Sequence, residues 1–467
     1  MHKNIRHFCA DNVLTYLLNF GLIIENTFQG PVNMMVKNTL KKVREYLREI
    51  VFSCKFIGEH RMKDTDFTRK RILGFPEIFT IIVKGAKRGI HTAIKEILDR
   101  VYTQEEYYSE MAFCKARRKI NYTAFQECAT LVAKAFYTEA RSEKRWKEFR
   151  VWGIDGSKIN LPTNPEILEE FGSENFKNGL RAQGLGSILY DTLNGITLDA
   201  ELARHNANER ELASGHLKKL KDFCDEAGTD SSLELITMDR GYPSEALIQQ
   251  AIEYGISFVF RVNQKHFWKE LLCLKDTDKD TIITHKGLTL RAVQVPLKEK
   301  EITKSGEVIK MATLLTNLPS DKYSTDDIAE LYHLRWNIET NYGFLKNRVE
   351  IENFTGLSPL CVRQDFYAAI LLSNLVACAF YDASDVAAEY SNGKKYDYKP
   401  NYTETYRELR RDLFDLMLSD SKYTFNRIYK KIQEEIYDTL IPIRKNRNPK
   451  RGKPHQGPRY FHNHKPS

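Results

Sequence analysis

The sequence predicts an α/β protein in which helices pack on a mixed β-sheet, with helical regions before and after it. Three observations support this prediction. Residues 1–145 show apolar residues at helical spacing and little strand pattern. From residue 149 to residue 262 the pattern changes to strand, hairpin, helix, strand, helix and strand. About sixty residues with strand character and frequent turn residues then follow, before the pattern becomes helical again.

The central region begins with a predicted strand at 149–161, interrupted by the polar run Asp155-Gly156-Ser157. Apolar runs on both sides of Asn194-Gly195 predict a β-hairpin, because this dipeptide suits a tight two-residue turn. The remaining predicted elements are a helix at 208–227, a strand at 233–238, a helix at 243–254 and a strand at 257–262.

The later part of the chain is predicted to be β-rich at first and then helical. Strand patterns cover 281–297 and 308–318. Ser324 followed by Thr325, Asp326 and Asp327 indicates a helix start with an acidic first turn. The predicted helices are 331–350, 365–381, 403–418 and 423–440.

Composition excludes several classes of protein. Hydrophobic residues make up 42% and aromatic residues 11% of the 467 residues, which is enough for large cores and argues against global disorder. The most apolar stretch, 368–381, is shorter than the ~20 residues of a membrane span and is predicted to be a buried helix. The N-terminus lacks the pattern of a secretory signal. Eight cysteines without a CxxC pair predict reduced thiols and argue against a disulfide scaffold or a structural zinc.

Positive charge is concentrated at the C-terminus. The net charge is +9, and residues 441–467 contain eight Lys and Arg but no acid, so the rest of the chain has a net charge of only about +1. The same tail has five of the fourteen prolines. Such a tail suits a polyanion such as nucleic acid, although a solvated, disordered terminus explains it equally well. Two basic clusters, 67–71 and 115–119, suggest a DNA-backbone surface, but charge runs usually just face water.

A polar stripe on the predicted helix 331–350 is the strongest functional pattern. At about 100° per residue, four polar side chains share an arc of roughly 60° beside the apolar face. They are Tyr332, Arg335, Glu339 and Lys346. The alternative is a solvent-facing stripe in which Arg335 and Glu339 form an i,i+4 salt bridge.

Two aspartates follow apolar strands and precede glycines. Asp155 and Asp239 both lie where a predicted strand ends. Carboxylates at strand ends, completed by a glutamate from a packing helix, are hard oxygen ligands of the kind that Mg²⁺ and Mn²⁺ prefer. Two such ions can activate a nucleophile and stabilise a leaving oxygen in phosphodiester chemistry.

The spacing Tyr332-x2-Arg335-x3-Glu339-x6-Lys346 resembles the tyrosine–arginine–glutamate–lysine signature of bacterial cut-and-paste DDE transposases of insertion-sequence family four. Residues 153–157 and 238–242 resemble the family's first and second aspartate blocks. Segments 67–71, 116–119 and 442–444 resemble family segments too, so the resemblance covers nearly the whole chain.

This resemblance implies an RNase H-like catalytic core, with the first aspartate on the first strand and the second on the neighbouring fourth. Asp155, Asp239 and Glu339 would be the catalytic residues and would bind two Mg²⁺ ions, with Mn²⁺ as an alternative. Tyr332, Arg335 and Lys346 would hold phosphates near the cleaved end.

The resemblance also gives the expected domain organisation: an RNase H-like core divided by a β-rich insertion, between two helical regions. The expected parts are 1–145, the helical DNA-binding region; 146–264, the first part of the core; 265–323, the insertion; 324–385, the second part of the core; and 386–467, the helical C-terminal region with its basic tail.

Further DNA contacts are expected outside the stripe. Trp268, at the start of the insertion, could stack on a flipped base, as some family members do, although core packing is the commoner role of such a residue. The basic clusters add four candidates, Arg69, Arg71, Arg117 and Lys119.

The expected function is that of a transposase that cuts the inverted-repeat ends of its element and joins the freed 3′-hydroxyls to target DNA. It would act in the bacterial cytoplasm with the nucleoid, as a homodimer on paired ends, without a membrane, and with a hairpin intermediate in some members. The alternatives are an RNase H-like nuclease without strand transfer and a catalytically silent DNA-binding protein derived from a transposase.

Overall fold

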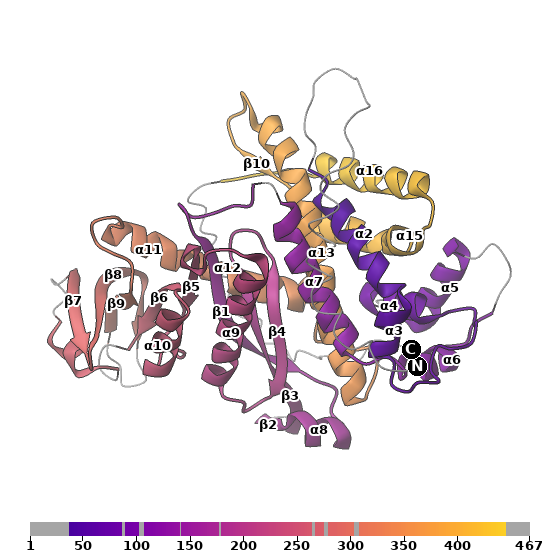
Figure 1. Ribbon diagram of the computed structural model, residues 1–467, viewed down its shortest axis with the longest axis horizontal. Coiled ribbons are helices and arrows are strands. Elements are labelled where there is room, and N and C mark those ends of the chain that lie inside the picture. The colour runs from indigo at the N-terminus through magenta and orange to yellow at the C-terminus, as the bar shows by residue number, and fades with distance from the viewer. Residues whose placement is uncertain are drawn as a thin grey trace, which may run out of the picture.

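The computed structural model describes residues 37–444, apart from 86–88, 102–106, 141, 177–178, 264–266, 275–278 and 303–307. A long sheet forms one half of the molecule, and a group of helices from both ends of the chain forms the other (Figure 1). The predicted α/β class is therefore confirmed. The domain boundaries given above stay predictions.

The central sheet has nine strands in the part of the chain that the structure describes. In chain order they are β1 (Arg150–Asn160), β2 (Ser173–Phe176), β3 (Gly179–Asp191), β4 (Thr197–Arg204), β5 (Glu234–Met238), β6 (Ser257–Val262), β7 (Asp280–His285), β8 (Leu288–Ile302) and β9 (Val308–Thr316).

Five of these strands lie in the order β4-β3-β1-β5-β6. β3 is antiparallel to β1 and to β4, whereas β5 is parallel to β1 and to β6. This is the expected RNase H-like arrangement, with the strand of the first aspartate next to the strand of the second. The hairpin between β3 and β4 contains Asn194 and Gly195, and Gly195 has the positive φ of +79° that this turn requires.

The insertion extends the same sheet instead of forming a separate one. β9 pairs with β6 in antiparallel fashion, and β8 and β7 continue outward from β9. The predicted β-rich character of this region is confirmed, and the short 3₁₀ helix Lys269–Cys273 precedes its strands.

Helices pack against the sheet from both faces. α9 (Glu209–Ala227) contacts β1, β3 and β4, and α12 (Trp336–Phe344) contacts β1. Side chains alternate between the faces of a strand, so Gly153 and Gly156 of β1 face opposite ways. A Cβ at Gly153 would lie 3.5 Å from Ile338 of α12, and one at Gly156 would lie 3.3 Å from Glu209 of α9. The two helices therefore reach β1 from opposite faces, each over a glycine.

The remaining elements beside the sheet are α8 (Pro165–Phe171), the 3₁₀ turn Ser231–Leu233, α10 (Glu245–Glu253) and α11 (Thr325–Leu334). The predicted continuous helix 331–350 is wrong in detail. α11 ends at Leu334, α12 begins at Trp336, and the π-helix Leu345–Val349 follows. Helical hydrogen bonding changes register at Arg335 and again after Phe344, and a hydrophobic pattern cannot reveal such changes.

The helical half combines the two ends of the described chain (Figure 1). Its elements are α2 (Thr39–Val51), α3 (Cys54–His60), α4 (Phe75–Lys84), α5 (Ile90–Val101), α6 (Glu110–Arg117), α7 (Thr123–Glu139), α13 (Pro359–Ser391), α14 (Tyr402–Arg411), α15 (Leu413–Leu418), α16 (Lys422–Asp438) and the small β10 (Tyr398–Lys399) and β11 (Ile441–Pro442) pair. Residues 445–467, most of the basic tail, lie outside the described residues, as do residues 1–36.

Helix α13 is the central helix of this half and packs against α2, α4, α7, α14 and α16. It is longer than the predicted 365–381 and, by length and hydropathy alone, could cross a membrane. However, 94% of its most apolar window is buried inside the protein, which agrees with the predicted buried helix. The seven cysteines of the described residues are free thiols.

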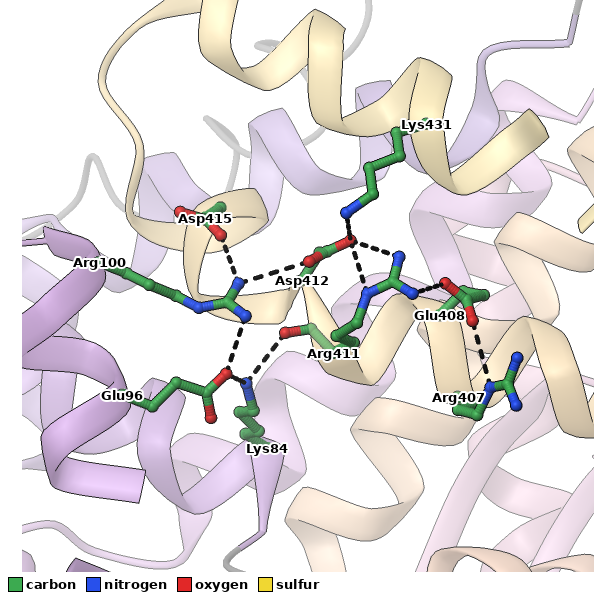
Figure 2. A network of polar contacts seen from close by, with 9 residues as sticks. All are labelled: Lys84, Glu96, Arg100, Arg407, Glu408, Arg411, Asp412, Asp415 and Lys431. Atoms are coloured by element: carbon green, nitrogen blue, oxygen red, sulfur yellow. Dashed lines mark hydrogen bonds and ion pairs between the residues drawn. The ribbon is translucent and has the colours of Figure 1, made fainter. Parts of the chain in front are cut away.

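A network of charged side chains joins the N-terminal helices to the C-terminal ones (Figure 2). Arg100 of α5 lies 2.6 Å from Asp415 and 3.4 Å from Asp412. Asp412 also pairs with Arg411 at 2.9 Å and with Lys431 of α16 at 3.4 Å. Asp412 is 5% exposed and accepts contacts from three cations, so it is the centre of the network.

The environment of Asp412 has a consequence for stability. Burial acts to raise the pKa of this carboxyl, but Arg411 and Lys431 outweigh it and lower the pKa below its usual value. A carboxyl with a depressed pKa in the folded state stabilises the protein above its unfolded-state pKa, and this contribution is lost as the pH falls through the folded-state value.

Asp412→Asn should therefore lower the free energy of unfolding at pH 7 by about 1–3 kcal/mol, less than a fully buried pair would cost because Arg411 and Lys431 are partly exposed. The difference from wild type should shrink below about pH 4. Urea unfolding at several pH values measures it. Glu59→Gln, in the exposed Lys55–Glu59 pair, is the control and should change little. An unchanged midpoint at pH 7 for Asp412→Asn would contradict the role of the network.

Candidate active site

Asp155 and Asp239 lie side by side at one edge of the sheet. In the parallel pair β1 and β5, Gly153 is level with Thr237. Asp155 and Asp239 each come two residues after this pair in their own strand direction, so the pairing register places them next to each other. β5 ends at Met238, whereas β1 continues to Asn160. Both aspartates therefore lie at the point where β1 is no longer paired with β5.

Glu339 approaches the same edge from helix α12. Ile338, the preceding residue of the helix, packs over Gly153 of β1, where a Cβ would lie 3.5 Å from it. The charges of Glu339 and Asp239 both act to raise the pKa of Asp155, so the three carboxyl groups influence one another electrostatically. The structure thus brings the three predicted catalytic residues to one place.

A buried guanidinium lies among these acids. Arg335 is 4% exposed, and its Nη2 donates to Oε1 of Glu339 at 2.8 Å. Its charge also acts on Asp155 and Asp239. The predicted alternative, a salt bridge between Arg335 and Glu339, is present, but the pair is not a surface pair because the guanidinium is buried.

The two aspartates differ in their electrostatic environment. Burial raises the pKa of Asp155 to about 6, although Arg335 and the Gly156 N–H act against it. Burial also acts to raise the pKa of Asp239, but Arg335, the Arg240 N–H, Arg261 and Tyr332 together lower it. Asp239 is therefore the carboxylate that the protein itself keeps charged, and Asp155 is the one whose charge is least compensated.

Tyr332 and Arg261 explain much of this difference. The Tyr332 hydroxyl donates to Oδ1 of Asp239 at 3.0 Å, and Arg261 lies 3.7 Å from the same oxygen. Burial, together with the charge of Asp239, raises the pKa of Tyr332 to about 12, so the hydroxyl remains a donor at neutral pH. Arg261 was not among the predicted site residues. It is the single charged residue of the strand Ser257–Val262.

Lys346 contacts a later part of β1 than the three acids do. Its Nζ donates to the carbonyl oxygen of Lys158 at 2.6 Å and lies 3.4 Å from Glu352. Lys346 is the second residue of the π-helix Leu345–Val349, and its side chain reaches the last part of β1. Its role as a phosphate contact stays a prediction.

Two predicted DNA contacts are corrected by the structure. Arg117 is 2% exposed and donates to Gln364, Thr355, Cys361 and Asp365, so its guanidinium is engaged inside the protein. Trp268 is 5% exposed and stacks on His285, with ring centroids 4.5 Å apart. Each side chain is used in packing, which leaves it unavailable to DNA in this structure.

The other basic candidates lie at the surface. Arg69 and Arg71 are exposed. Lys119 is half exposed and lies 3.3 Å from Asp66. Their contact with DNA stays a prediction.

The three carboxylates fit a divalent cation by their chemistry, because Asp155, Asp239 and Glu339 are hard oxygen donors converging from two strands and a helix. Among the described residues, however, no three potential ligands are close enough together to hold an ion as they stand. In this structure Oε1 of Glu339 accepts a hydrogen bond from Arg335.

The strand order is that of the RNase H-like fold that the sequence predicted. Residues 146–375 match the protein family described as Transposase DDE domain. Residues 146–375 are therefore similar to the DDE domain of transposases, and the resemblance seen in the sequence is confirmed.

Two curated relatives illustrate the relationship. The chain is 24% identical over 185 residues to a putative transposase of insertion sequence element IS186A of Escherichia coli strain K12, and equally to the transposase of element IS421 of Escherichia coli. Each alignment covers 31% of this chain and 50% of the relative, so the chain spans about half the length of the curated relatives it matches.

A solved structure of the piggyBac transposase synaptic complex with hairpin DNA is also similar. The TM-score is 0.44 and the sequence identity 13%, over 87% of this chain and 88% of that chain. A likeness at this score adds nothing to the fold assignment, which rests on the strand order.

The uncompensated charge of Asp155 should cost stability. Its folded-state pKa, about 6, lies above the unfolded value of 3.8, so the folded protein loses stability as the pH rises from about 4 to about 6. At pH 7.5 the free energy of unfolding of Asp155→Asn should exceed that of wild type by about 1–3 kcal/mol. This difference should vanish near pH 4. Thermal unfolding without divalent ions measures it, with exposed Asp64→Asn as the control. A variant less stable than wild type at pH 7.5 would contradict this assignment.

Arg335 should contribute far more than a surface pair does. Arg335→Ala leaves several carboxylates without their shared cation and should cost about 3 kcal/mol of unfolding free energy. Lys430→Ala, in the exposed Lys430–Glu434 pair, should cost about 0.5 kcal/mol or less. Equal losses in the two variants, measured by urea unfolding, would mean that Arg335 stabilises no more than a surface cation.

Proposed function

We propose that this protein is a DNA transposase that cuts the inverted-repeat ends of its insertion sequence and joins the freed 3′-hydroxyls to target DNA. The observation that supports it best is the meeting of Asp155, Asp239 and Glu339 at one sheet edge, with Arg335 among them. Three carboxylates and a guanidinium there suit a phosphodiester and its metal ions better than they suit a binding module.

The proposed roles of the site residues, which are metal binding, orientation and phosphate binding, follow from their chemistry. Asp155, Asp239 and Glu339 would hold Mg²⁺, or Mn²⁺, with two ions per site. When bound, these ions activate the attacking oxygen and stabilise the leaving one. Tyr332 orients Asp239 through its hydrogen bond. Arg335 and Lys346 bind phosphate oxygens by charge, and a bidentate guanidinium also fixes their orientation.

Other parts of the chain would hold the DNA. The exposed Arg69, Arg71 and Lys119 of the N-terminal helical region and the basic tail to residue 467 offer positive charge for the backbone. Because each active site acts on one end, coordinated excision calls for a homodimer on paired ends. The place of action would be the bacterial cytoplasm, on the nucleoid.

The cut-and-paste route, with or without a hairpin intermediate, is the finer part of the proposal. A plain nuclease of the same fold would stop after hydrolysis, and a silent DNA-binding protein would not cleave at all. The DNA flanking the gene should contain inverted repeats, which provide the substrate for the decisive assay.

Asp155→Ala, Asp239→Ala and Glu339→Ala should each reduce Mg²⁺-dependent nicking of end DNA by at least about 10³-fold, because each removes a ligand from a site that supplies several kcal/mol of charge stabilisation. Binding of the same DNA, measured by gel shift, should stay within about threefold, since phosphate contacts elsewhere dominate affinity.

The assay combines labelled end DNA with a target plasmid. Joined products from wild type exclude the plain nuclease, and nicking excludes the silent DNA-binding protein. Glu330→Gln, on the neighbouring helix α11, is the control and should nick normally. Full nicking by any of the three alanine variants would remove that residue from the site.

A further inference from the structure

The helical segment that contains Glu339 runs along strand β1 in the same direction. Three successive contacts join the two elements in order: Ile338 with Gly153, Tyr342 with Asp155, and Lys346 with Lys158. Four residues of an α-helix rise about 6 Å, and two residues of a strand extend about 6.6 Å. The helix and the strand therefore advance together from the first contact to the second, and Glu339 lies between these two contacts on the helix.

The contact at Asp155 consists of buried hydrogen bonds to the main chain. The Tyr342 hydroxyl donates to the carbonyl oxygen of Asp155 at 3.0 Å and to that of Gly186, on the neighbouring strand β3, at 2.8 Å. Tyr342 is 6% exposed, and a hydrogen bond away from water is electrostatically stronger than one in water. Helix α12 is thus bonded directly to a residue that the sequence predicts to be catalytic.

A hydrogen bond specifies the position of the helix more narrowly than the apolar contact does. The contact of Ile338 with Gly153 is an ordinary van der Waals contact, which has no preferred direction. An O–H···O hydrogen bond needs a distance of about 2.5–3.0 Å and a nearly straight angle. The Tyr342 hydroxyl therefore fixes where α12 lies along β1.

The start of α12 is tied to the same strand through the turn between β3 and β4. Nδ2 of Asn337 donates to the carbonyl oxygen of Thr192 at 2.9 Å. The N–H of Thr192 in turn donates to the carbonyl oxygen of Val151 in β1 at 2.9 Å. Glu339 lies between Asn337 and Tyr342 in the helix, so the turn that contains it is held to β1 on both sides.

A divalent ion makes this spacing matter. Asp155 and Glu339 are far apart in the chain, so only tertiary contacts fix the distance between them. Mg²⁺ requires nearly ideal octahedral geometry with oxygen ligands at about 2.0–2.1 Å. Loss of the hydrogen bonds that hold ligands in place typically weakens metal binding by about 10–100-fold.

We propose that Tyr342 is a positioning residue, whose hydrogen bond to the main chain of Asp155 sets the distance between Glu339 and Asp155 and thereby the affinity of the site for its divalent ion. The inference rests on the proposed function. Tyr342 contacts neither the ion nor DNA in this role and acts only through the strand and the helix that it joins.

The first test measures binding of Mn²⁺ alone to the full chain, from the electron paramagnetic resonance signal of the free ion. The binding that Asp155→Ala removes is the binding at this site. Tyr342→Phe keeps the ring and removes only the hydroxyl, and it should weaken this binding by about tenfold.

The second test measures nicking of end DNA over a range of Mg²⁺ concentrations. Tyr342→Phe should raise the half-saturating Mg²⁺ concentration by about tenfold, whereas the rate at saturating Mg²⁺ should stay within about threefold of wild type. A purely structural role predicts the opposite, a lower maximal rate with an unchanged Mg²⁺ requirement.

Tyr429→Phe is the matched control. The Tyr429 hydroxyl is also buried, and it donates to Asp382 at 2.8 Å in the helical half of the protein. Both variants lose buried hydrogen bonds and should unfold at a lower temperature than wild type. Only Tyr342→Phe should change Mn²⁺ binding.

Asn337→Ala tests the same arrangement at an exposed residue, where folding is not at risk. It should weaken Mn²⁺ binding by about threefold, because its hydrogen bond holds the start of the helix and not Asp155 itself. Wild-type Mn²⁺ binding in both Tyr342→Phe and Asn337→Ala, or an equal loss in Tyr429→Phe, would overturn the proposal. Failure of the proposed function looks different, since wild type itself would then neither bind Mn²⁺ at this site nor nick end DNA.

Discussion

The candidate active site depends on a single buried guanidinium. Three carboxylates meet at one sheet edge, and Arg335 is the cation at their centre. Without it, Asp155, Asp239 and Glu339 would repel one another in a partly buried place where such repulsion is strong. Arg335 also donates a hydrogen bond to Glu339. The same residue therefore balances the charge of the acids and holds one of them directly.

Both faces of β1 are closely covered around Asp155. Helix α12 lies over Gly153 on one face, and Tyr242 and Glu209 lie over Gly156 on the other. A Cβ at Gly156 would be tight against the Tyr242 hydroxyl at 3.1 Å, whereas one at Gly153 would make ordinary contacts at 3.4 Å or more. Close packing therefore favours glycine more strongly at position 156 than at position 153.

Local patterns predicted much of this fold. The strands before Asp155 and Asp239, the hairpin at Asn194 and the helix start at Ser324 all follow from residues near one another in the chain. What the sequence could not predict depends on tertiary contacts. The change to a π-helix at Leu345 and the pairing of β9 with β6, which joins the insertion to the central sheet, are not visible in local patterns. The packing of Glu209 and Tyr242 over Gly156 could not be predicted either, since nothing local to either residue indicates it.

Arg117 illustrates why positive charge in a motif does not by itself indicate a DNA contact. It lies in the basic cluster 115–119, yet four neighbours accept hydrogen bonds from its guanidinium, among them Asp365 at the start of α13. Taking the Arg117 guanidinium out of these buried contacts would destabilise the protein more than a phosphate contact at the surface would stabilise a DNA complex. Arg117 therefore fixes the N-terminal helical region to the helix that follows the Glu339 segment. Through α13, and through the charge network around Asp412, the helices of both chain ends form one support for the sheet, on which the geometry of the acids depends.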